Sequence, residues 1–163
     1  MEHLPPAEIS YKAVPVYKVI ACESASRKGL RKPRMRFRSS ADVYALLANF
    51  YKMQEPERET ISMLMLDAGH RVVGLYPVST GTLNLAVVHP REVFRMALLV
   101  PGCAAIVIVH NHPSGDPAPS EEDVRMTKQM VLAGNDLGVP VLDHVIMGDG
   151  RHYSFADMKR LSS

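Results

Sequence analysis

The strongest constraint on the fold is an apolar run near the middle of the chain, CAAIVIV at residues 103–109. Its β-branched residues follow one another without polar alternation, which is typical of a strand that is covered on both faces. Around this run, helical and strand patterns interleave along the sequence, and one pair of strands forms an adjacent hairpin. We therefore expect an α/β fold in which a mixed β-sheet is flanked by helices.

Local patterns predict the individual elements. Apolar spacing with polar start signals and glycine stop signals predicts helices at residues 41–51, 89–99 and 120–138. Ser39 or Ser40 can cap the first of these helices. A hairpin is expected at residues 60–79, with its turn around Asp67 and Gly69. Strands are expected at residues 11–24, 82–88 and 139–148, and a strand end plus a short helix at residues 153–161.

The length of 163 residues suits one compact domain with a sizeable core. We expect residues 1–40 to supply a tail, a strand and a basic segment, packed on the core or preceding it. Residues 41–163 are expected to form the principal domain. Hydrophobic residues make up 47% of the chain and charged residues 22%, a balance that excludes a disordered or fibrous protein.

Basic residues gather in one segment, although the net charge of the whole chain is only +2. They are Arg27, Lys28, Arg31, Lys32, Arg34, Arg36 and Arg38. Such a segment can contact the phosphates of a nucleic acid. A solvated loop or hairpin edge is the other interpretation, and the sequence leaves both open.

The cellular compartment is inferred from what the sequence lacks. Cys22 and Cys103 are too few for a disulfide framework or a cysteine-based zinc cluster. The N-terminal residues MEHLPPAEIS have neither the basic nor the apolar part of a signal peptide. No window approaches the roughly 20 apolar residues of a membrane-spanning helix. We therefore expect a cytoplasmic protein without a membrane partner, and the sequence leaves its oligomeric state open.

A polar segment, HNHPSGDPAPSEED at residues 110–123, follows the apolar run directly. His110 and His112 lie at the end of the predicted strand, where side chains two residues apart project to the same face. Ser120 and Asp123 fall on one face of the first turn of the next helix. Two imidazoles and one carboxylate form a three-ligand set for zinc and leave a fourth position for water, as catalytic sites require.

These residues also have structural interpretations. The two histidines can bond to neighbouring carbonyls, and a serine followed three residues later by an aspartate is a helix-capping pattern that contributes about 1 kcal/mol. Capping and ligation can coexist in part, but we do not expect a ligand carboxylate to point back at its own backbone. His144 lies in a predicted buried strand and is expected to be a core histidine bonded to a carbonyl. Asn111 should point away from the histidines and bond to a loop.

The spacing H-x-H, seven residues, then S-x-x-D resembles the JAMM motif of JAB/MPN metalloproteases. The segment HNHPSGDPAPS is similar to sequences of the RadC family, as are GTLNLAVVHPREVF upstream and VLDHVIMGDGRHYSF downstream. This resemblance runs from about residue 12 to about residue 160. It implies that residues 41–163 form a JAB/MPN domain, which is a cytidine-deaminase-like fold.

The resemblance also implies a catalytic glutamate. A zinc hydrolase needs a carboxylate that takes and returns a proton. In JAB proteases this glutamate stands just before the first apolar strand of the domain, and the matching residue in PERETISMLML is Glu59. Three other glutamates are rivals for the role: Glu55, Glu57 and Glu92.

The implied mechanism assigns a role to each of five residues. His110, His112 and Asp123 would hold zinc, and Glu59 would act as base and then as acid. Ser120 would stabilise the oxyanion that forms when an amide carbonyl is attacked.

The leading functional expectation is therefore a zinc-dependent peptidase or isopeptidase that cuts a protein or peptide substrate. One alternative is a nucleic-acid-binding protein, because the family is customarily labelled with DNA repair. However, long RadC proteins carry an N-terminal helix-hairpin-helix region, for which this sequence has no room. Another alternative is a catalytically silent module that binds a partner, and the presence of all five motif positions argues against it.

Overall fold

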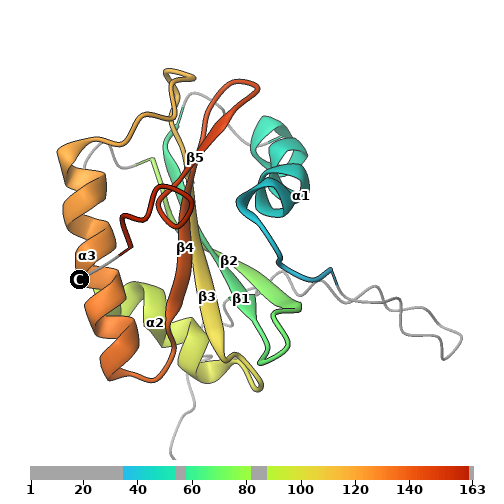
Figure 1. Ribbon diagram of the computed structural model, residues 1–163, viewed down its shortest axis with the longest axis vertical. Helices are drawn as coiled ribbons and strands as arrows, with labels where there is room; N and C mark the ends of the chain where they lie inside the picture. Colours follow the sequence, from blue (N-terminus) through green and yellow to red (C-terminus); the bar gives the residue numbers. More distant parts are fainter. Residues whose placement is uncertain (1–34, 54–57, 82–87, 162–163) are drawn as a thin grey trace, which may run out of the picture.

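The computed structural model of the protein describes residues 35–53, 58–81 and 88–161. It contains a five-stranded sheet with the strand order β2-β1-β3-β4-β5 (Figure 1). β3 and β4 run parallel, and the other neighbouring strands are antiparallel, so the sheet is mixed as predicted. The strands are β1 Thr60–Leu66, β2 Val72–Thr80, β3 Ala105–Asn111, β4 Val141–Met147 and β5 His152–Ser154.

Helices cover both faces of the sheet. α1 (Ser40–Met53) lies on one side, and α2 (Pro90–Leu99) and α3 (Glu121–Asp136) lie on the other (Figure 1). Every residue of β3 is buried. Ile106 and Ile108 pack in the cluster under α2 and α3, whereas Val107 and Val109 pack in the cluster under α1. The prediction of a central strand covered on both faces, and with it the α/β fold class, is confirmed.

Most of the other predicted elements within the described residues are also confirmed. β1 and β2 form the expected hairpin, and α2 begins with Pro90 after His89. The His89 side chain caps this helix by accepting a hydrogen bond from the backbone N–H of Arg91, a role that the sequence did not indicate. α3 begins after Ser120, and Gly138 follows its end with a φ of 68°, a conformation that glycine adopts without strain.

The short helix predicted within residues 153–161 is wrong. After β5 the chain forms turns, and Lys159 has a φ of 55°, which interrupts any helix. The buried carboxylate of Asp143 in β4 accepts hydrogen bonds from the hydroxyl of Ser154 at 2.7 Å and from the backbone N–H of Ala156 at 3.0 Å. These bonds to the sheet determine the path of the segment, whose own backbone hydrogen bonds, such as that from the N–H of Met158 to the carbonyl of Ser154, form turns.

Contacts from the C-terminal part of the chain hold the start of α1. The hydroxyl of Ser40 donates to Asp157 Oδ2 at 2.6 Å and lies 2.9 Å from His152 Nε2, and the His152 ring stacks on Tyr44. Ser40 therefore anchors the helix to the turns after β5, whereas the Asp42 carboxylate accepts the backbone N–H groups that precede the helix.

Several sequence predictions fall outside the described residues. They are the strand at 11–24, nearly all of the strand at 82–88, and the basic segment as far as residue 34. The division of the chain at residue 40 also stays a prediction. Among the described helices, none is both long enough and apolar enough to cross a membrane.

Gly134 in α3 is a position where helix propensity and packing make opposite predictions. At an exposed helix position, alanine in place of glycine stabilises the helix by about 1 kcal/mol. A Cβ at Gly134, however, would lie 2.7 Å from the carbonyl oxygen of Val139 and 3.1 Å from Cζ of Phe94. We expect Gly134→Ala to lower the free energy of unfolding by about 1–3 kcal/mol, measured by chemical denaturation.

The control is Asn135→Ala at the neighbouring exposed position, which should change stability little. A Gly134→Ala protein that is more stable than the wild type would contradict the close packing of Gly134 against Val139 and Phe94.

Candidate metal centre

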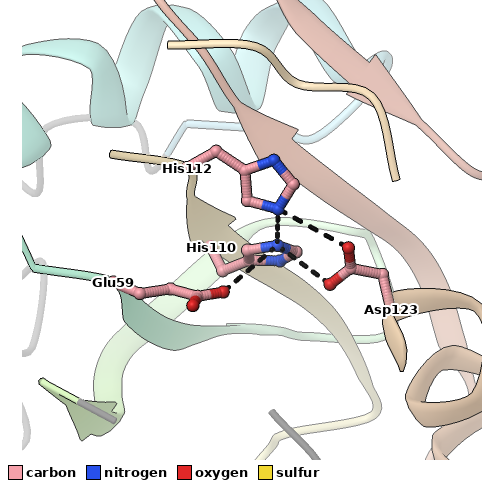
Figure 2. A group of neighbouring side chains, drawn as sticks. All are labelled: Glu59, His110, His112 and Asp123. Atoms are coloured by element: carbon pink, nitrogen blue, oxygen red, sulfur yellow. Dashed lines mark hydrogen bonds and ion pairs between the residues drawn. The ribbon is translucent and has the colours of Figure 1, made fainter. Parts of the chain in front are cut away.

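Four predicted site residues converge at one end of the sheet, where Figure 2 shows their side chains pointing toward one another. His110 lies in β3, His112 lies just beyond its end, Glu59 directly precedes β1, and Asp123 lies in the first turn of α3. One potential ligand atom from each residue lies within 4.8 Å of the other three. Since Ile61 of β1 pairs with His110 of β3, the sheet itself brings Glu59 to the histidines.

The shortest distances in the cluster involve the Nε2 atoms of the histidines. Nε2 of His110 lies 2.9 Å from Nε2 of His112, 3.1 Å from Oδ1 of Asp123 and 3.8 Å from Oε1 of Glu59. His112 Nε2 lies 3.5 Å from Asp123 Oδ2. The His110 and Asp123 side chains are fully buried, whereas those of His112 and Glu59 are 16% and 13% exposed. The cluster is therefore closed on one side and open to solvent on the other.

Asp123 corrects the expectation that a ligand carboxylate does not point back at its own backbone. Its Oδ2 accepts hydrogen bonds from the backbone N–H and the hydroxyl of Ser120, both at 2.7 Å. Ser120 Oγ in turn accepts the N–H of Asp123, which completes a capping box. Oδ1 of Asp123 is buried without a hydrogen-bond partner and faces His110. One oxygen thus caps α3, and the other is available to a metal.

Ser120 is beside the cluster but is not one of its four converging residues. Its hydroxyl proton is donated to Asp123, so in this arrangement it holds the carboxylate in place. The role that the sequence resemblance implies for Ser120, stabilising an oxyanion, stays a prediction.

The loop after His112 is fixed by the turn between β4 and β5. The backbone N–H of His112 donates to Met147, and the N–H of Asp149 donates to Gly115. A Cβ on Gly148 would lie 2.5 Å from the carbonyl oxygen of Gly115, so the two segments touch along their backbones. Within this loop the carbonyl of Asp116 lies 2.7 Å from Nδ1 of His112. Because a carbonyl only accepts, Nδ1 of His112 carries the proton and Nε2 is free to bind a metal.

Asn111 fixes the backbone on both sides of Glu59. Its Oδ1 accepts the N–H of Thr60 at 2.8 Å, and its Nδ2 donates to the carbonyl of Arg58 at 3.0 Å. The prediction that Asn111 points away from the histidines and bonds to a loop is thereby confirmed. The residue between the two histidines therefore helps to determine where the glutamate lies.

The mutual field of these groups shifts their pKa values. Burial raises the pKa of Glu59, although the nearby imidazoles of His110 and His112 oppose that shift. The Asp123 carboxylate that faces its ring raises the pKa of His112, against the effect of burial. Burial alone would raise the pKa of Asp123, but the facing imidazoles of His110 and His112 outweigh burial and hold that pKa well below its usual range. Asp123 is therefore an ionised ligand candidate.

The unpaired atoms of the cluster fit a cation. Oε1 of Glu59 and Oδ1 of Asp123 are both buried without a hydrogen-bond partner, and buried acceptors of this kind are costly unless something compensates them. Two imidazoles and one carboxylate suit Zn²⁺ better than Mg²⁺ or Ca²⁺, which prefer oxygen ligands. The residues form a candidate metal-binding group, and the metal that JAB domains often use is zinc.

Sequence reasoning missed the function of one further histidine. His144 in β4 is fully buried as expected, but it is bonded to side chains and not to a carbonyl. Its Nε2 lies 2.8 Å from Nδ1 of His110, and its Nδ1 lies 2.6 Å from Oγ1 of Thr127. The available signal was a pair of titratable residues, Asp143 and His144, in an otherwise apolar strand. That this strand lies next to the strand of His110 could not be derived from it.

The chain matches the family model described as the RadC-like JAB domain over residues 37–161. The chain belongs to this family, and the JAB/MPN fold implied by the sequence resemblance is confirmed. Among similar curated proteins, the UPF0758 protein of Methanosarcina acetivorans is 44% identical over 128 residues, which are 78% of this chain and 55% of that protein. The UPF0758 protein of Caldanaerobacter subterraneus is 46% identical over 119 residues, 73% of this chain and 50% of that protein. The chain thus spans about half the length of the curated relatives it matches.

Replacing Asn111 by aspartate tests the connection between β3 and the segment that carries Glu59. A carboxylate still accepts the N–H of Thr60 but meets the carbonyl of Arg58 without a proton to donate. We expect Asn111→Asp to lower the free energy of unfolding by about 1–3 kcal/mol, because it replaces a hydrogen bond by the repulsion between a carboxylate and a carbonyl oxygen. Chemical denaturation measures this, and an unchanged unfolding midpoint would mean that the connection contributes nothing to stability.

Zinc binding should weaken as the pH falls. Zinc bound by His112 would require its neutral imidazole, and Asp123 raises the pKa of that imidazole, so protons would compete from a higher pH than at an ordinary histidine. We expect the apparent zinc affinity, measured against a competing chelator, to decrease steadily from about pH 8 to about pH 6. The exposed histidine variant His70→Asn should show the same profile. An affinity that does not change over this range would contradict ligation by His112.

Proposed function

We propose that this chain is a zinc-dependent amide hydrolase of the JAB type, a peptidase or isopeptidase that acts on a protein or peptide substrate. The observation that carries the proposal is the buried, unpaired Oδ1 of Asp123, which lies 3.1 Å from His110 Nε2 in a cluster of four potential ligand atoms. A capping aspartate needs only one oxygen for the helix. The second oxygen faces Nε2 of His110, and a cation bound in the cluster would supply the partner that this oxygen lacks.

Three of the four residues would hold the metal. The side chains of His110 and Asp123 are fully buried, and that of His112 is 16% exposed. Each of the three makes a further hydrogen bond on the side away from the cluster. A zinc ion bound there would lower the pKa of a water molecule and polarise the amide carbonyl of a substrate. Three protein ligands leave room for both.

Glu59 is the proposed proton carrier. Its Oε1 is unpaired and lies 3.8 Å from His110 Nε2, the longest of the distances from that atom. Glu59 would accept a proton from the water that attacks the amide and return it to the leaving nitrogen. The raised pKa that burial gives its carboxyl suits both steps, because it brings the carboxyl closer to neutral pH. Ser120 would stabilise the developing oxyanion by turning its hydroxyl from Asp123 to the substrate oxygen.

A cleft next to the cluster supports a peptide-sized substrate. Its volume is about 340 Å³, and His112 forms part of its wall. The other wall comes from α1 and from the turn between β4 and β5, and it carries both apolar and polar groups. The lining includes Tyr44, Ala48, Pro113, Ser114, Met147 and Asp149. His112 is the cluster residue that lines this cleft, so a peptide bound there would meet the site at His112.

Separating metal binding from proton transfer tests the proposal. We expect the wild-type protein to bind about one equivalent of zinc and the double variant His112→Ala, Asp123→Ala to bind none, by metal analysis after gentle purification. Glu59→Gln should keep the zinc and the fold but lower amide hydrolysis by about 10²–10⁴-fold, as removal of a general base does. The assay needs a substrate found in a peptide library by mass spectrometry.

The matched control is Glu92→Gln. Glu92 was a rival candidate, but it lies on α2 with its carboxylate paired to Arg91 and Arg95. This variant should hydrolyse the substrate at the wild-type rate. Full zinc retention in the double variant would refute the metal site, and wild-type turnover by Glu59→Gln would refute Glu59 as the base.

A further inference from the structure

A buried chain of hydrogen bonds leads from His110 back to α3. His110 Nδ1 lies 2.8 Å from His144 Nε2, His144 Nδ1 lies 2.6 Å from Thr127 Oγ1, and Thr127 Oγ1 lies 2.6 Å from the backbone carbonyl oxygen of Asp123. The side chains of His110, His144 and Thr127 are at most 1% exposed. We call this chain of bonds the histidine relay. It begins at one candidate ligand and ends on the backbone of another.

The last acceptor of the histidine relay fixes the direction of every bond. A backbone carbonyl only accepts, so Thr127 donates its hydroxyl proton to Asp123. Thr127 Oγ1 has no second proton and must therefore accept one from His144 Nδ1. Nε2 of a neutral His144 is then bare and accepts the Nδ1 proton of His110. The Nε2 of His110, which faces the cluster, is left without a proton.

The opposite direction would block the site. If Thr127 donated to Nδ1 of His144, then Nε2 of His144 would donate to Nδ1 of His110. The proton of His110 would lie on Nε2, where a metal would bind. The Asp123 carbonyl prevents this reversal because it occupies the only proton of the Thr127 hydroxyl. The plane of the His144 ring is held by stacking on Phe155, with a centroid distance of 4.9 Å and an interplanar angle of 4°.

His110 needs such a relay because it lies inside the sheet. His112 is in a loop and donates its Nδ1 proton directly to the carbonyl of Asp116. His110 is paired with β1 on one side and with β4 on the other, where neighbouring carbonyls are engaged in the strand ladders. Two side chains therefore extend the path from its Nδ1 to a carbonyl outside the sheet. Both histidines end with the same tautomer, although only one of them has a carbonyl within reach.

We propose that Thr127 and His144 are positioning residues of the metal centre, which set the tautomer and ring orientation of His110 so that its Nε2 can bind the cation. This inference rests on the proposed function for its purpose, but the tautomer that it assigns is a property of the chain alone. Partners that orient a ligand histidine in this way typically change metal affinity by about 10–100-fold when they are removed.

The test compares Thr127→Val, which has nearly the same shape without the hydroxyl, with Thr127→Ser, which keeps the hydroxyl. Full-length protein with ¹⁵N-labelled histidine is studied by long-range ¹H–¹⁵N correlation, which shows which ring nitrogen carries the proton. Zinc affinity of each protein is measured against a competing chelator. Ser62→Ala is the control, because Ser62 is a buried residue of β1 whose hydroxyl has no hydrogen-bond partner.

We expect His144 to be protonated on Nδ1 and bare at Nε2 in the wild type, with and without zinc. Thr127→Ser and Ser62→Ala should preserve both this tautomer and the zinc affinity. Thr127→Val should lose the single tautomer and bind zinc about 10–100-fold more weakly. Recovery of both properties by serine separates an effect of the hydroxyl from a general loss of packing.

Two results would overturn the inference. One is a wild-type His144 protonated on Nε2, a result that does not depend on whether any variant folds. The other is a Thr127→Val protein with unchanged tautomer and unchanged zinc affinity, which would leave the proposed hydrolase intact. A wild-type protein that binds no zinc but has the expected His144 tautomer would refute the proposed function and still support the direction of the relay.

Discussion

The four proton acceptors of the candidate metal centre repel one another, and the fold must hold them together. Two imidazole nitrogens and two carboxylate oxygens lie within 4.8 Å of one another, and most of their surroundings exclude water. At low local dielectric such an arrangement is costly, and the cost falls when each group is held from behind and when a cation binds in front. Each group is held by a different part of the fold: a loop carbonyl for His112, the capping box for Asp123, β4 for His110, and Asn111 for the segment of Glu59.

Much of the fold could be predicted because its elements carry strong local patterns. The unbroken apolar run in β3 requires cover on both faces, and the capping serine before α3 defines the start of that helix. The segment after β5 has no such signal. Its path depends on the carboxylate of Asp143, more than ten residues away in the sequence, so local sequence alone led to the prediction of a short helix where turns occur.

The candidate site divides in the same way. His110, His112 and Asp123 could be predicted because strand alternation and helix spacing indicate, from the local sequence, the face to which each side chain points. Glu59 came from the family resemblance, since its position depends on β1 lying beside β3. The contact between His144 and His110 depends on the order and register of strands, which local spacing does not contain. The two separate tasks of the Asp123 oxygens could not be read from residue types at all.

The close contact between Gly148 and Gly115 has a consequence for protein engineering. The candidate metal-binding motif looks portable, because its three potential ligands occur within fourteen consecutive residues. Its loop, however, is shaped by a second segment that begins more than thirty positions later and leaves no space for a methyl group. A graft of residues 110–123 onto another scaffold would therefore carry the potential ligands without the neighbouring segment that sets their geometry. The smallest transplantable unit is discontinuous and includes the turn between β4 and β5.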